Sequence, residues 1–446
     1  YYNYNKCKNS EVGVIIKREI MDEIQEYIER KEYICITGSR QTGKTTLLQL
    51  LKEFIIKKEE KKRRDYPIIN FEDRTLLFQF EKSPLEFIRS YIKNKEDRTY
   101  IFLDEFQYVQ DGGQKLKLIF DTVSNLKIFI TGSSSFDIQS SIGKYMVGRL
   151  LNFTLTPFSF GEYLDAKNSH LFKIYTENHN KITDLITSGK PIEVKRGVDP
   201  FSEEFQKLYE EYCLWGGFPQ VVLTENIKHR KKILTELLNN YLLKDINFLL
   251  KVPRDSSLIL LLQHLSGSIG NLISYQNLGE RSGLEYRKIK QYLNILFQTF
   301  ICYELRPFFK KKNKEISRNP KIYFSDLGFR NVFLNNFNPL DIRSDSGAII
   351  ENAALSGLKR VVGDSTGINF WRTKAGSKVD FVLRLGPELI PVEVKYRNFK
   401  SEKITRSFYS FIDTFKPRIS LVLTKSYAGY LKKNTTEIYF FPVYYL

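Results

Sequence analysis

The sequence has few cysteines and no long hydrophobic run, and both scarcities narrow the class of protein. Its four cysteines, Cys7, Cys35, Cys213 and Cys302, stand far apart, and none forms a CxxC pair. We therefore expect neither a disulfide scaffold nor a zinc site, and we expect a reducing compartment. The strongest apolar run, LILLLQHL, is too short to span a bilayer, and the first residues, YYNYNKCKNS, show no signal-peptide pattern. These features predict a cytoplasmic protein without a membrane partner.

Acidic residues are also in short supply relative to basic ones. The chain has 69 Lys and Arg against 51 Asp and Glu, a formal net charge of +18 over 446 residues. Such an excess favours a polyanionic partner, with nucleic acid ahead of an anionic membrane surface. A lysine-rich proteome would produce the same excess, so the charge alone leaves both interpretations open. The length indicates about three domains.

Strand-like and helical patterns alternate in the first third of the chain. A helix is expected over 14–30, a strand over 33–37 and a helix over 45–58, followed by buried strands near 66–71, 100–106 and 127–133. This alternation predicts a parallel α/β sheet. A more polar stretch at 165–205 suggests an exposed insertion or lid, and helices resume at 203–250.

A glycine-bounded loop joins the first strand to the next helix. The stretch ITGSRQTGKTTLL matches the pattern GxxxxGK[ST] in the context that a phosphate-binding loop requires. Backbone N–H groups and the helix N-terminus would hold the phosphates, Lys44 would reach the terminal phosphates, and Thr45 would bind Mg²⁺. We expect ATP and Mg²⁺ as cofactors, and a chance glycine turn is the alternative. The predicted nucleotide contacts in this loop are Gly38, Ser39, Arg40, Gln41, Thr42, Gly43, Lys44, Thr45 and Thr46.

A second acidic element, YIFLDEFQYV, places Asp104 and Glu105 at the end of a buried strand. Asp104 would bind Mg²⁺ and Glu105 would polarise the attacking water, although a helix cap by Asp104 would give the same pattern. Ser133 or Ser134, after a further strand, would sense the γ-phosphate or cap a helix. Arg149 is a candidate for stabilising charge in its own site or in that of a neighbouring copy, and a plain surface contact is the alternative.

A basic helical module occupies 274–325. Residues 274–301 have helix–turn–helix spacing, followed by two strand-like ends around a lysine-rich loop, as in a winged helix. One face of the second helix would enter a major groove and the loop would contact phosphates, or the fold would be a spacer between domains. The residues expected to contact DNA are Arg287, Lys288, Lys290 and Gln291 on the helix and Lys310, Lys311, Lys312 and Lys314 in the loop.

The last part of the chain carries acids on strands. In KVDFVL and IPVEVKYR, Asp380 faces away from its apolar neighbours, and Glu393 and Lys395 share one strand face. If these strands pair as a hairpin, Asp380, Glu393 and Lys395 can converge. Glu351 lies on an otherwise apolar helix. Two carboxylates can hold Mg²⁺ at a scissile phosphate beside an orienting lysine, but opposite charges on a solvated strand face are also common.

The chain as a whole resembles prokaryotic AAA-type ATPases fused to a C-terminal restriction-endonuclease-like domain. The motifs that carry this resemblance are GSRQTGKTTLL, LDEFQYV, ITGSSS, GRLLNFTLTPFSFGEYL, YCLWGGFPQ, NPKIYFSDLGFRN, GAIIENAAL, WRTKAGSKVDFVL and IPVEVK. It implies nucleotide roles for Lys44, Thr45, Asp104 and Glu105. It implies nuclease-type roles, typical of PD-(D/E)xK sites, for Glu351, Asp380, Glu393 and Lys395.

The resulting fold class is an α/β protein with a P-loop (ASCE/AAA-type) parallel-sheet core. We expect a P-loop ATPase domain at 1–156, a helical lid or insertion at 157–250, a winged helix at 251–335 and an α/β restriction-endonuclease-like domain at 336–446. The leading hypothesis is an ATP-dependent DNA-processing enzyme with a Mg²⁺-dependent nuclease-like domain. The rivals are a nucleotide-gated DNA- or protein-binding switch with a silent nuclease fold, and a signalling ATPase that acts on proteins. A homo-oligomer is plausible because many related ATPases use a neighbour's arginine.

Overall fold

The structure is a computed structural model that describes residues 15–58, 66–94, 96–132, 142–241, 256–309, 315, 318–363 and 366–446. The chain divides into two compact units. The first is formed chiefly by the described residues up to Phe158, and the second chiefly by residues from Ser159 onward. The predicted lid, winged helix and C-terminal domain all contribute to the second unit.

The first unit is built around a five-stranded parallel sheet with the order β2-β3-β4-β1-β5. This confirms the predicted parallel α/β core. Its elements are α1 (Ile20–Gln25), β1 (Tyr33–Thr37), α2 (Lys44–Lys58), β2 (Ile68–Asn70), α3 (Arg74–Lys82), α4 (Pro84–Ser90), β3 (Thr99–Asp104), η1 (Phe106–Tyr108), α5 (Gly112–Thr122), β4 (Leu126–Gly132) and β5 (Leu150–Thr154).

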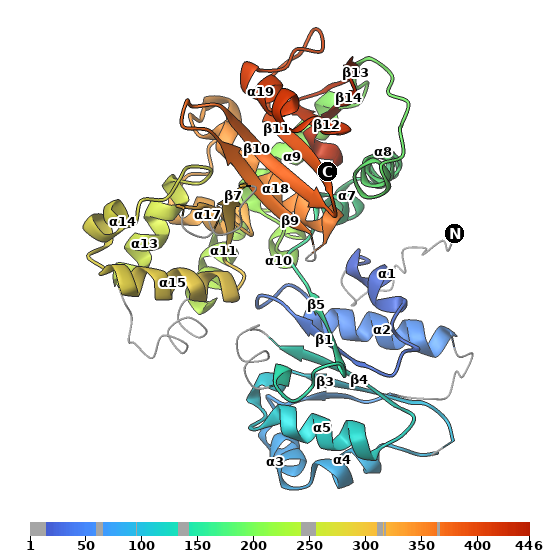
Figure 1. The fold of residues 1–446 in the computed structure, drawn as a ribbon. Coiled ribbons are helices and arrows are strands. Elements are labelled where there is room, and N and C mark those ends of the chain that lie inside the picture. Colours follow the sequence, from blue (N-terminus) through green and yellow to red (C-terminus); the bar gives the residue numbers. More distant parts are fainter. Residues whose placement is uncertain are drawn as a thin grey trace. The chain divides into compact units, whose positions relative to one another are not determined.

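Helices cover both faces of this sheet, as Figure 1 shows. Alternate strand residues such as Ile34, Ile36 and Phe129 pack with α1 and α2, while Cys35, Ile101 and Ile130 pack with α3, α4 and α5. Both sets are fully buried, as the continuous apolar strands require in a sheet covered on both sides. The carboxyl ends of the parallel strands therefore meet along one edge, where α/β folds place their ligands.

The first helix is shorter than its apolar spacing predicts. The expected helix over 14–30 is helical only in α1, and turns follow it although Ile28 is fully buried. The buried Lys127 on β4 donates hydrogen bonds to the carbonyls of Tyr27 (2.7 Å) and Arg30 (3.1 Å), and also to that of Glu32. These contacts hold the turns at the edge of the sheet opposite the loop after β1. Burial lowers the pKa of Lys127 to about 7.

The second unit combines helices with one large sheet. Its elements up to β8 are α7 (Phe160–Lys167), α8 (Ser169–Ser188), β6 (Gly197–Val198), α9 (Ser202–Trp215), α10 (Pro219–Val222), α11 (Ile227–Tyr241), α13 (Ser256–Gly267), α14 (Tyr275–Ser282), α15 (Tyr286–Gln298), β7 (Cys302–Pro307) and β8 (Lys321–Phe324). The remainder are α17 (Leu327–Phe333), η4 (Leu340–Ile342), α18 (Ser346–Val362), β9 (Gly367–Arg372), β10 (Lys378–Leu385), β11 (Glu388–Lys395), α19 (Arg406–Phe415), β12 (Ile419–Thr424), β13 (Tyr427–Lys433), β14 (Thr436–Pro442) and η5 (Val443–Tyr445).

The nine-stranded sheet has the order β6-β13-β14-β12-β11-β10-β9-β7-β8. It crosses two of the predicted domain boundaries, because β7 and β8 come from the expected winged helix and β6 from the expected lid. The strand β7 runs parallel to β9, with Arg306 opposite Asn369, and β6 pairs with β13. The predicted lid helices are also part of this unit, since α8 and α9 pack against α18 and η5.

Two helices lie against the central strands of this sheet. Phe411 of α19 packs with Trp371, Val379 and Val382 of the sheet in an aromatic and aliphatic core. The helix α18 packs against β11. Among the described residues, none of the helices combines the length and the apolar character that crossing a membrane requires.

Candidate functional site

The loop between β1 and α2 lies at the carboxyl edge of the first sheet and is held in a strained, compact form. Gly43 has φ +94°, and Gln41 adopts a left-handed backbone with φ +58°. A Cβ on Gly38 would lie 2.1 Å from the carbonyl oxygen of Leu155, so only glycine fits there. Ser39 and Thr42 are buried, Arg40 is half-buried, and Thr45 and Thr46 are exposed at the start of α2. The loop thus presents its backbone and the helix N-terminus to one side.

Lys44 is 5% exposed and lies close to the loop itself. Its ammonium donates to the carbonyls of Gly38 (3.1 Å) and Ser39 (3.0 Å). The hydroxyl of Thr42 also donates to the carbonyl of Ser39, at 2.9 Å. The lysine that the motif assigns to the phosphates is therefore positioned inside the loop by main-chain oxygens.

Asp104, at the end of β3, joins the loop to the neighbouring strand. Its carboxylate is 1% exposed and accepts hydrogen bonds from Thr45 Oγ1 (2.7 Å) and from Thr131 Oγ1 on β4. Thr131 Oγ1 in turn accepts from the backbone N–H of Glu105, at 3.1 Å. A hydroxyl and a carboxylate in contact at a phosphate-binding loop form an oxygen set of the kind that Mg²⁺ prefers. Thr45 and Asp104 therefore fit the predicted ion.

Glu105 follows directly in a left-handed conformation, with φ +55°. Its Oε2 accepts a hydrogen bond of 2.5 Å from Nε2 of Gln107, two residues further on in η1. A non-glycine residue in this backbone conformation is uncommon, and such strain gathers at functional sites. The contact with Gln107 restrains the carboxylate of Glu105.

Two predicted members of the nucleotide site do not lie with these residues. Arg149 directly precedes β5, where its carbonyl accepts from the N–H of Tyr33 at the start of β1. The loop follows the other end of that five-residue strand, so Arg149 lies roughly 15 Å away, at about 3.3 Å per residue. Its guanidinium pairs with Asp121 at 3.2 Å. Arg149 therefore lies away from the nucleotide loop of its own copy. Ser133 and Ser134 lie outside the described residues.

The second unit brings three of the predicted nuclease-type residues to one end of its sheet. β10 and β11 form the expected antiparallel hairpin, with Phe381 opposite Val392. Asp380 lies at a bulge in β10, and its Oδ2 accepts from the N–H of Val394 at 2.9 Å. Bulges often redirect side chains near active sites.

Glu393 is 4% exposed and lies between two donors on one of its oxygens. Its Oε1 accepts from Thr405 Oγ1 at 2.8 Å and pairs with Lys395 Nζ at 3.0 Å. Its other oxygen, Oε2, is buried without a hydrogen-bond partner. A buried carboxylate oxygen without a partner is costly, and an ion or ordered water is a common explanation. Asp380 and Glu393 therefore fit a divalent cation held by two carboxylates.

Glu351 on α18 does not join them in one cluster. Its Oε1 accepts from Lys321 Nζ (2.9 Å) and Tyr323 Oη (2.5 Å), both on β8. Burial, followed by the nearby carboxylates of Glu351 and Asp380, raises the pKa of Tyr323 above its usual range. Within the described residues, no three His, Cys, Asp or Glu side chains are arranged to hold a metal ion. The predicted triad of acids is thus reduced to a pair, with Glu351 held by the expected winged-helix hairpin.

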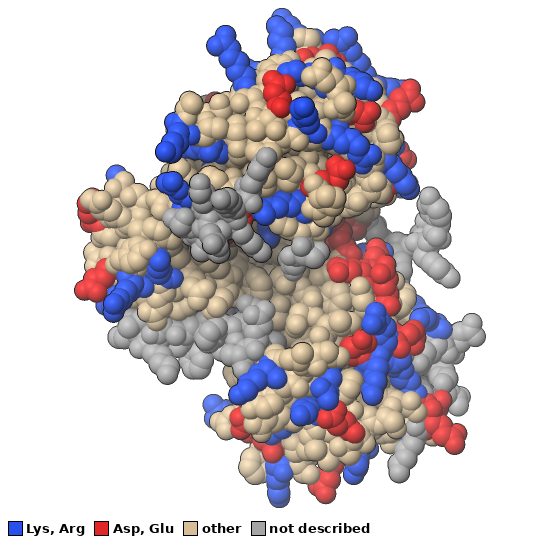
Figure 2. All heavy atoms as spheres, viewed as in Figure 1, with Lys and Arg blue, Asp and Glu red and all other residues tan. Residues whose placement is uncertain are grey.

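Exposed cations surround the end of the sheet that carries Asp380 and Glu393. Lys378 lies opposite Arg372 where β10 begins, and Lys395 lies opposite Thr424 where β11 ends. Figure 2 shows Lys and Arg side chains over the surface of the C-terminal part of the chain, with fewer acids among them. The exposed members at this end of the sheet are Arg372, Lys374, Lys378, Arg397 and Lys400.

Two helices, α14 and α15, lie within residues 274–301, where two helices joined by a turn were expected. Ser274 caps α14, and Gly283 makes the turn with φ +70°. Arg287, Lys288, Lys290 and Gln291 are all exposed on α15. Lys290 lies over the ring of Tyr286, 4.5 Å from its centre. Lys310, Lys311, Lys312 and Lys314 lie outside the described residues.

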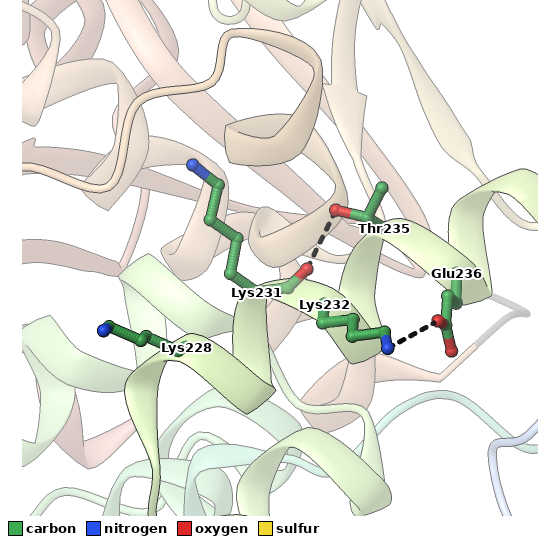
Figure 3. A pocket seen from close by; sticks show the side chains of 5 residues that line it. All are labelled: Lys228, Lys231, Lys232, Thr235 and Glu236. Atoms are coloured by element: carbon green, nitrogen blue, oxygen red, sulfur yellow. Dashed lines mark hydrogen bonds and ion pairs between the residues drawn. The ribbon is translucent and has the colours of Figure 1, made fainter.

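A further basic hollow on α11 does not gather its side chains around one point. It is lined by Lys228, Lys231, Lys232, Thr235 and Glu236. In Figure 3, Lys228 and Lys231 point apart. Lys231 donates to Asn335 at 2.8 Å, and Lys232 lies 3.9 Å from Glu236. This surface is a solvated helix face rather than a ligand site.

A protein-family model matches most of the first unit. Residues 30–164 match the family model of the AAA domain. The N-terminal part of the chain is therefore an AAA-type P-loop ATPase domain, as its sequence predicts. Residues 206–340 and 346–445 match two domains of unknown function, DUF8612 and DUF4143.

Similar proteins span most of the chain. A protein of Haemophilus influenzae described as uncharacterized is 22% identical over 91% of this chain and 92% of its own length. The uncharacterized protein MJ1544 of Methanocaldococcus jannaschii is 27% identical over 85% of this chain and 79% of its own. Among solved structures, the Walker-type ATPase PABY2304 of Pyrococcus abyssi gives a TM-score of 0.44 at 16% identity, covering 72% of this chain and 96% of that one. The Aeropyrum pernix ORC1 protein in complex with DNA gives 0.29 at 14%, covering 72% and 93%.

Several residues that contact the predicted site residues are not marked as functional by the sequence. Thr131, Gln107, Lys321, Tyr323 and Thr405 all contact a predicted site residue. Only Gln107 stands beside the motif that it serves, in LDEFQYV. The others are brought close by strand pairing or by a helix cap, which no local pattern marks.

Proposed function

We propose that this chain is an ATP-hydrolysing protein that binds and processes DNA, with a metal-dependent nuclease-type site in its second unit. The first unit would bind ATP through the loop at 38–45. Lys44 would donate to the terminal phosphates, and Mg²⁺ at Thr45 and Asp104 would neutralise phosphate charge. Glu105 would accept a proton from the attacking water.

The second unit would hold DNA on its basic surfaces. Arg287, Lys288 and Lys290 on α15 are exposed, as helix–turn–helix recognition requires. The cations around Asp380 and Glu393 would neutralise backbone phosphates, so binding would weaken as salt rises.

The observation that carries the nuclease assignment is the buried, unpartnered Oε2 of Glu393 beside Lys395. A divalent cation supplies polarisation of the scissile phosphate when it is bound. Asp380 and Glu393 would hold that ion, and Lys395 would orient the attacking water. The contact between Lys395 and Glu393 at 3.0 Å supports this role.

The test is to incubate the purified chain with labelled duplex, single-stranded and branched DNA. Mg²⁺ or Mn²⁺ is present, with and without ATP. We expect cutting that is lost in Glu393→Ala, and ATP hydrolysis that is lost in Lys44→Ala. Glu388→Ala, an exposed acid at the other end of β11, and Lys58→Ala, at the far end of α2, are the matched controls. Cutting that survives in Glu393→Ala would contradict the nuclease assignment.

A second candidate is a nucleotide-gated binding switch whose nuclease-like site is silent. The observation that favours it is the engagement of Glu351 by Lys321 and Tyr323, which leaves two acids instead of three. It predicts ATP hydrolysis without cutting of any of these DNA forms. Calorimetry that detects Mn²⁺ binding in the parent chain and its loss in Asp380→Asn would remove this candidate's main premise.

We also propose that the chain forms a homo-oligomer. Arg149 lies at the edge of the sheet opposite the nucleotide loop. It would therefore stabilise phosphate charge in the site of a neighbouring copy and not in its own. Mixing Arg149→Ala with Lys44→Ala tests this, because an intact site would form between unlike copies. Restored ATP hydrolysis in the mixture would support shared sites, and the sum of the two separate rates would count against them.

A further inference from the structure

Arg18 lies outside the AAA match, which begins at residue 30, yet it contacts the nucleotide loop. It is 5% exposed and precedes α1. One terminal nitrogen donates to the carbonyl of Thr42 at 2.6 Å, and the other donates to the carbonyl of Thr156 at 2.6 Å. The guanidinium carbon lies 4.8 Å from the centre of the Phe158 ring. One side chain therefore bridges the loop and the segment after β5.

That segment also packs directly against the loop backbone. The N–H of Leu155 donates to the carbonyl of Thr37 at 2.7 Å. The carbonyl of Leu155 occupies the position that a side chain on Gly38 would need. Residues 155–158 are the last of the first unit before the chain continues into the second at Ser159. A displacement of the loop would thus act on the point where the chain leaves the first unit.

A short series of contacts leads from the phosphate-binding lysine to Arg18. Lys44 donates to the carbonyl of Ser39, which also accepts from the hydroxyl of Thr42. Thr42 presents its own carbonyl to Arg18. When Lys44 turns its donors to a bound phosphate, the carbonyl of Ser39 loses a charged partner. That carbonyl keeps only the hydroxyl of Thr42, and hydrogen bonds from charged donors are the stronger ones. We therefore expect Thr42, and with it the carbonyl that Arg18 holds, to adjust.

We propose that Arg18 is a positioning residue that couples the nucleotide state of the loop to residues 155–158. This inference rests on the proposed nucleotide function. The planar guanidinium suits it, since its fixed fork can hold two carbonyls of different segments at once. A lysine at this position would keep the positive charge, but its single ammonium group lacks the planar, two-pronged geometry of the guanidinium.

The test is hydrogen–deuterium exchange on the full chain, with and without a non-hydrolysable ATP analogue. In the parent chain we expect the analogue to slow exchange of peptides covering 155–158 at least threefold. In Arg18→Gln this response should disappear, while affinity for a fluorescent ATP analogue changes less than about fivefold. Arg18→Lys should keep the fold and the affinity but lose most of the response.

Arg98 provides a matched control in the same unit. It donates to the carbonyls of Glu29 (2.6 Å) and Arg30 (2.5 Å) and lies 5.7 Å from the centre of the Tyr100 ring. Arg98→Gln removes an equivalent set of contacts away from the loop and should leave the response intact.

Three outcomes would overturn the inference: a response retained in Arg18→Gln, a response lost equally in Arg98→Gln, or no response in a parent chain that binds the analogue. If Arg18→Gln does not fold, Arg18→Lys decides alone, and a full response there also overturns it. A parent chain that does not bind the analogue would instead contradict the proposed nucleotide function.

Discussion

The two candidate sites differ in how completely their side chains are partnered. At the nucleotide site, Asp104 accepts from Thr45 and Thr131, and Thr131 accepts from the backbone of Glu105. At the acid–lysine site, Glu393 has one oxygen with two donors and one with none. Preorganised groups need little rearrangement when a ligand binds, whereas a buried unpartnered oxygen favours a ligand that would satisfy it. The carboxylate of Asp104 has a partner on each oxygen, whereas the carboxylate of Glu393 leaves one buried oxygen that a ligand could satisfy.

The difference follows from how each site is encoded. The nucleotide site depends on eight consecutive residues and on the ends of two neighbouring strands, β3 and β4. The acid–lysine site needs a hairpin with a bulge and the cap residue of α19. A contiguous loop fixes its own geometry, while a composite site depends on the packing of the whole unit.

The largest expected effect tests whether the nucleotide site is catalytic. Glu105→Gln should lower the turnover of ATP about 100-fold or more, because it removes the group that accepts the proton. Binding of a fluorescent ATP analogue should change little, because Lys44 and the loop remain. Steady-state hydrolysis and fluorescence titration measure the two quantities. Glu86→Gln, an exposed acid on α4, is the control. If ATP turnover persists in Glu105→Gln, the carboxylate of Glu105 is not the catalytic group of the first site.

The next effect tests whether the second unit's packing is independent of the first. Arg330 and Arg343 have side chains that are 1% exposed, and both pair with Asp345, at 2.5 Å and 2.8 Å. Asp345→Ala would leave two buried cations without this partner and should destabilise the second unit by about 3 kcal/mol. Urea unfolding should show the transition of the second unit at lower urea and that of the first unit unmoved. Asp341→Ala, exposed in η4, is the control.

The same pair predicts an acid dependence. Hydrogen bonds from Arg343 and then Arg330 hold the pKa of Asp345 below its usual range. The folded state therefore binds this proton less readily than the unfolded state. The stabilisation is present above the carboxyl's ordinary pKa of about 4 and is lost as the pH falls toward the lowered value. Asp345→Ala should flatten this part of the pH–stability curve, and an unchanged curve would contradict the assignment.

A third effect tests the acid–lysine site directly. Glu393→Gln should weaken Mn²⁺ binding to the chain at least about tenfold, because it removes a charged ligand at the unpartnered oxygen. Calorimetry in the absence of DNA and nucleotide gives the affinity, and Glu388→Gln is the matched control. ATP turnover should remain within twofold of the parent chain. Equal Mn²⁺ affinity in parent and variant would mean that the pair of acids is a structural feature only.

The sequence predicts the two sites to different depths for the same physical reason. The loop at 38–45 and Asp104 were predictable because a strand, a glycine turn and a helix are local signals. Thr131 was not, because it meets Asp104 only when β4 pairs beside β3. Lys321 was not predictable either, because it reaches Glu351 from β8. The partner of β8 is β7, which pairs with β9 some sixty residues further along the chain, with Arg306 opposite Asn369.

The same pairing places strands of the predicted winged helix and of the predicted C-terminal domain in one sheet, which no local sequence pattern indicates. The overlong first helix has a related cause. Its apolar spacing is real, but Arg18 contacts the loop and Lys127 fixes the following turns, and both contacts are tertiary. The position of Arg149 also depended on the register of β5 beside β1.

The smallest effect concerns how each site restrains its acid before a ligand binds. In the first site, Gln107 donates to Glu105 at 2.5 Å, and its own side-chain oxygen is buried without a partner. A buried oxygen without a partner costs free energy, so the observed position of Gln107 is not a favourable one by itself. We therefore expect its hydrogen bond to limit the movement of Glu105 without improving catalysis. Gln107→Ala should free the Glu105 carboxylate to reach the attacking water. We expect ATP turnover to rise about two- to fivefold, the change that one hydrogen bond of about 1 kcal/mol would produce.

Gln110→Ala, on the exposed turn after η1, is the control for changes in this segment. Single-turnover hydrolysis separates a faster chemical step from faster product release. If turnover falls in Gln107→Ala, the glutamine supports the productive position of Glu105. The first site would then resemble the second, where Lys395 and Thr405 hold one oxygen of Glu393 and leave the other for a ligand.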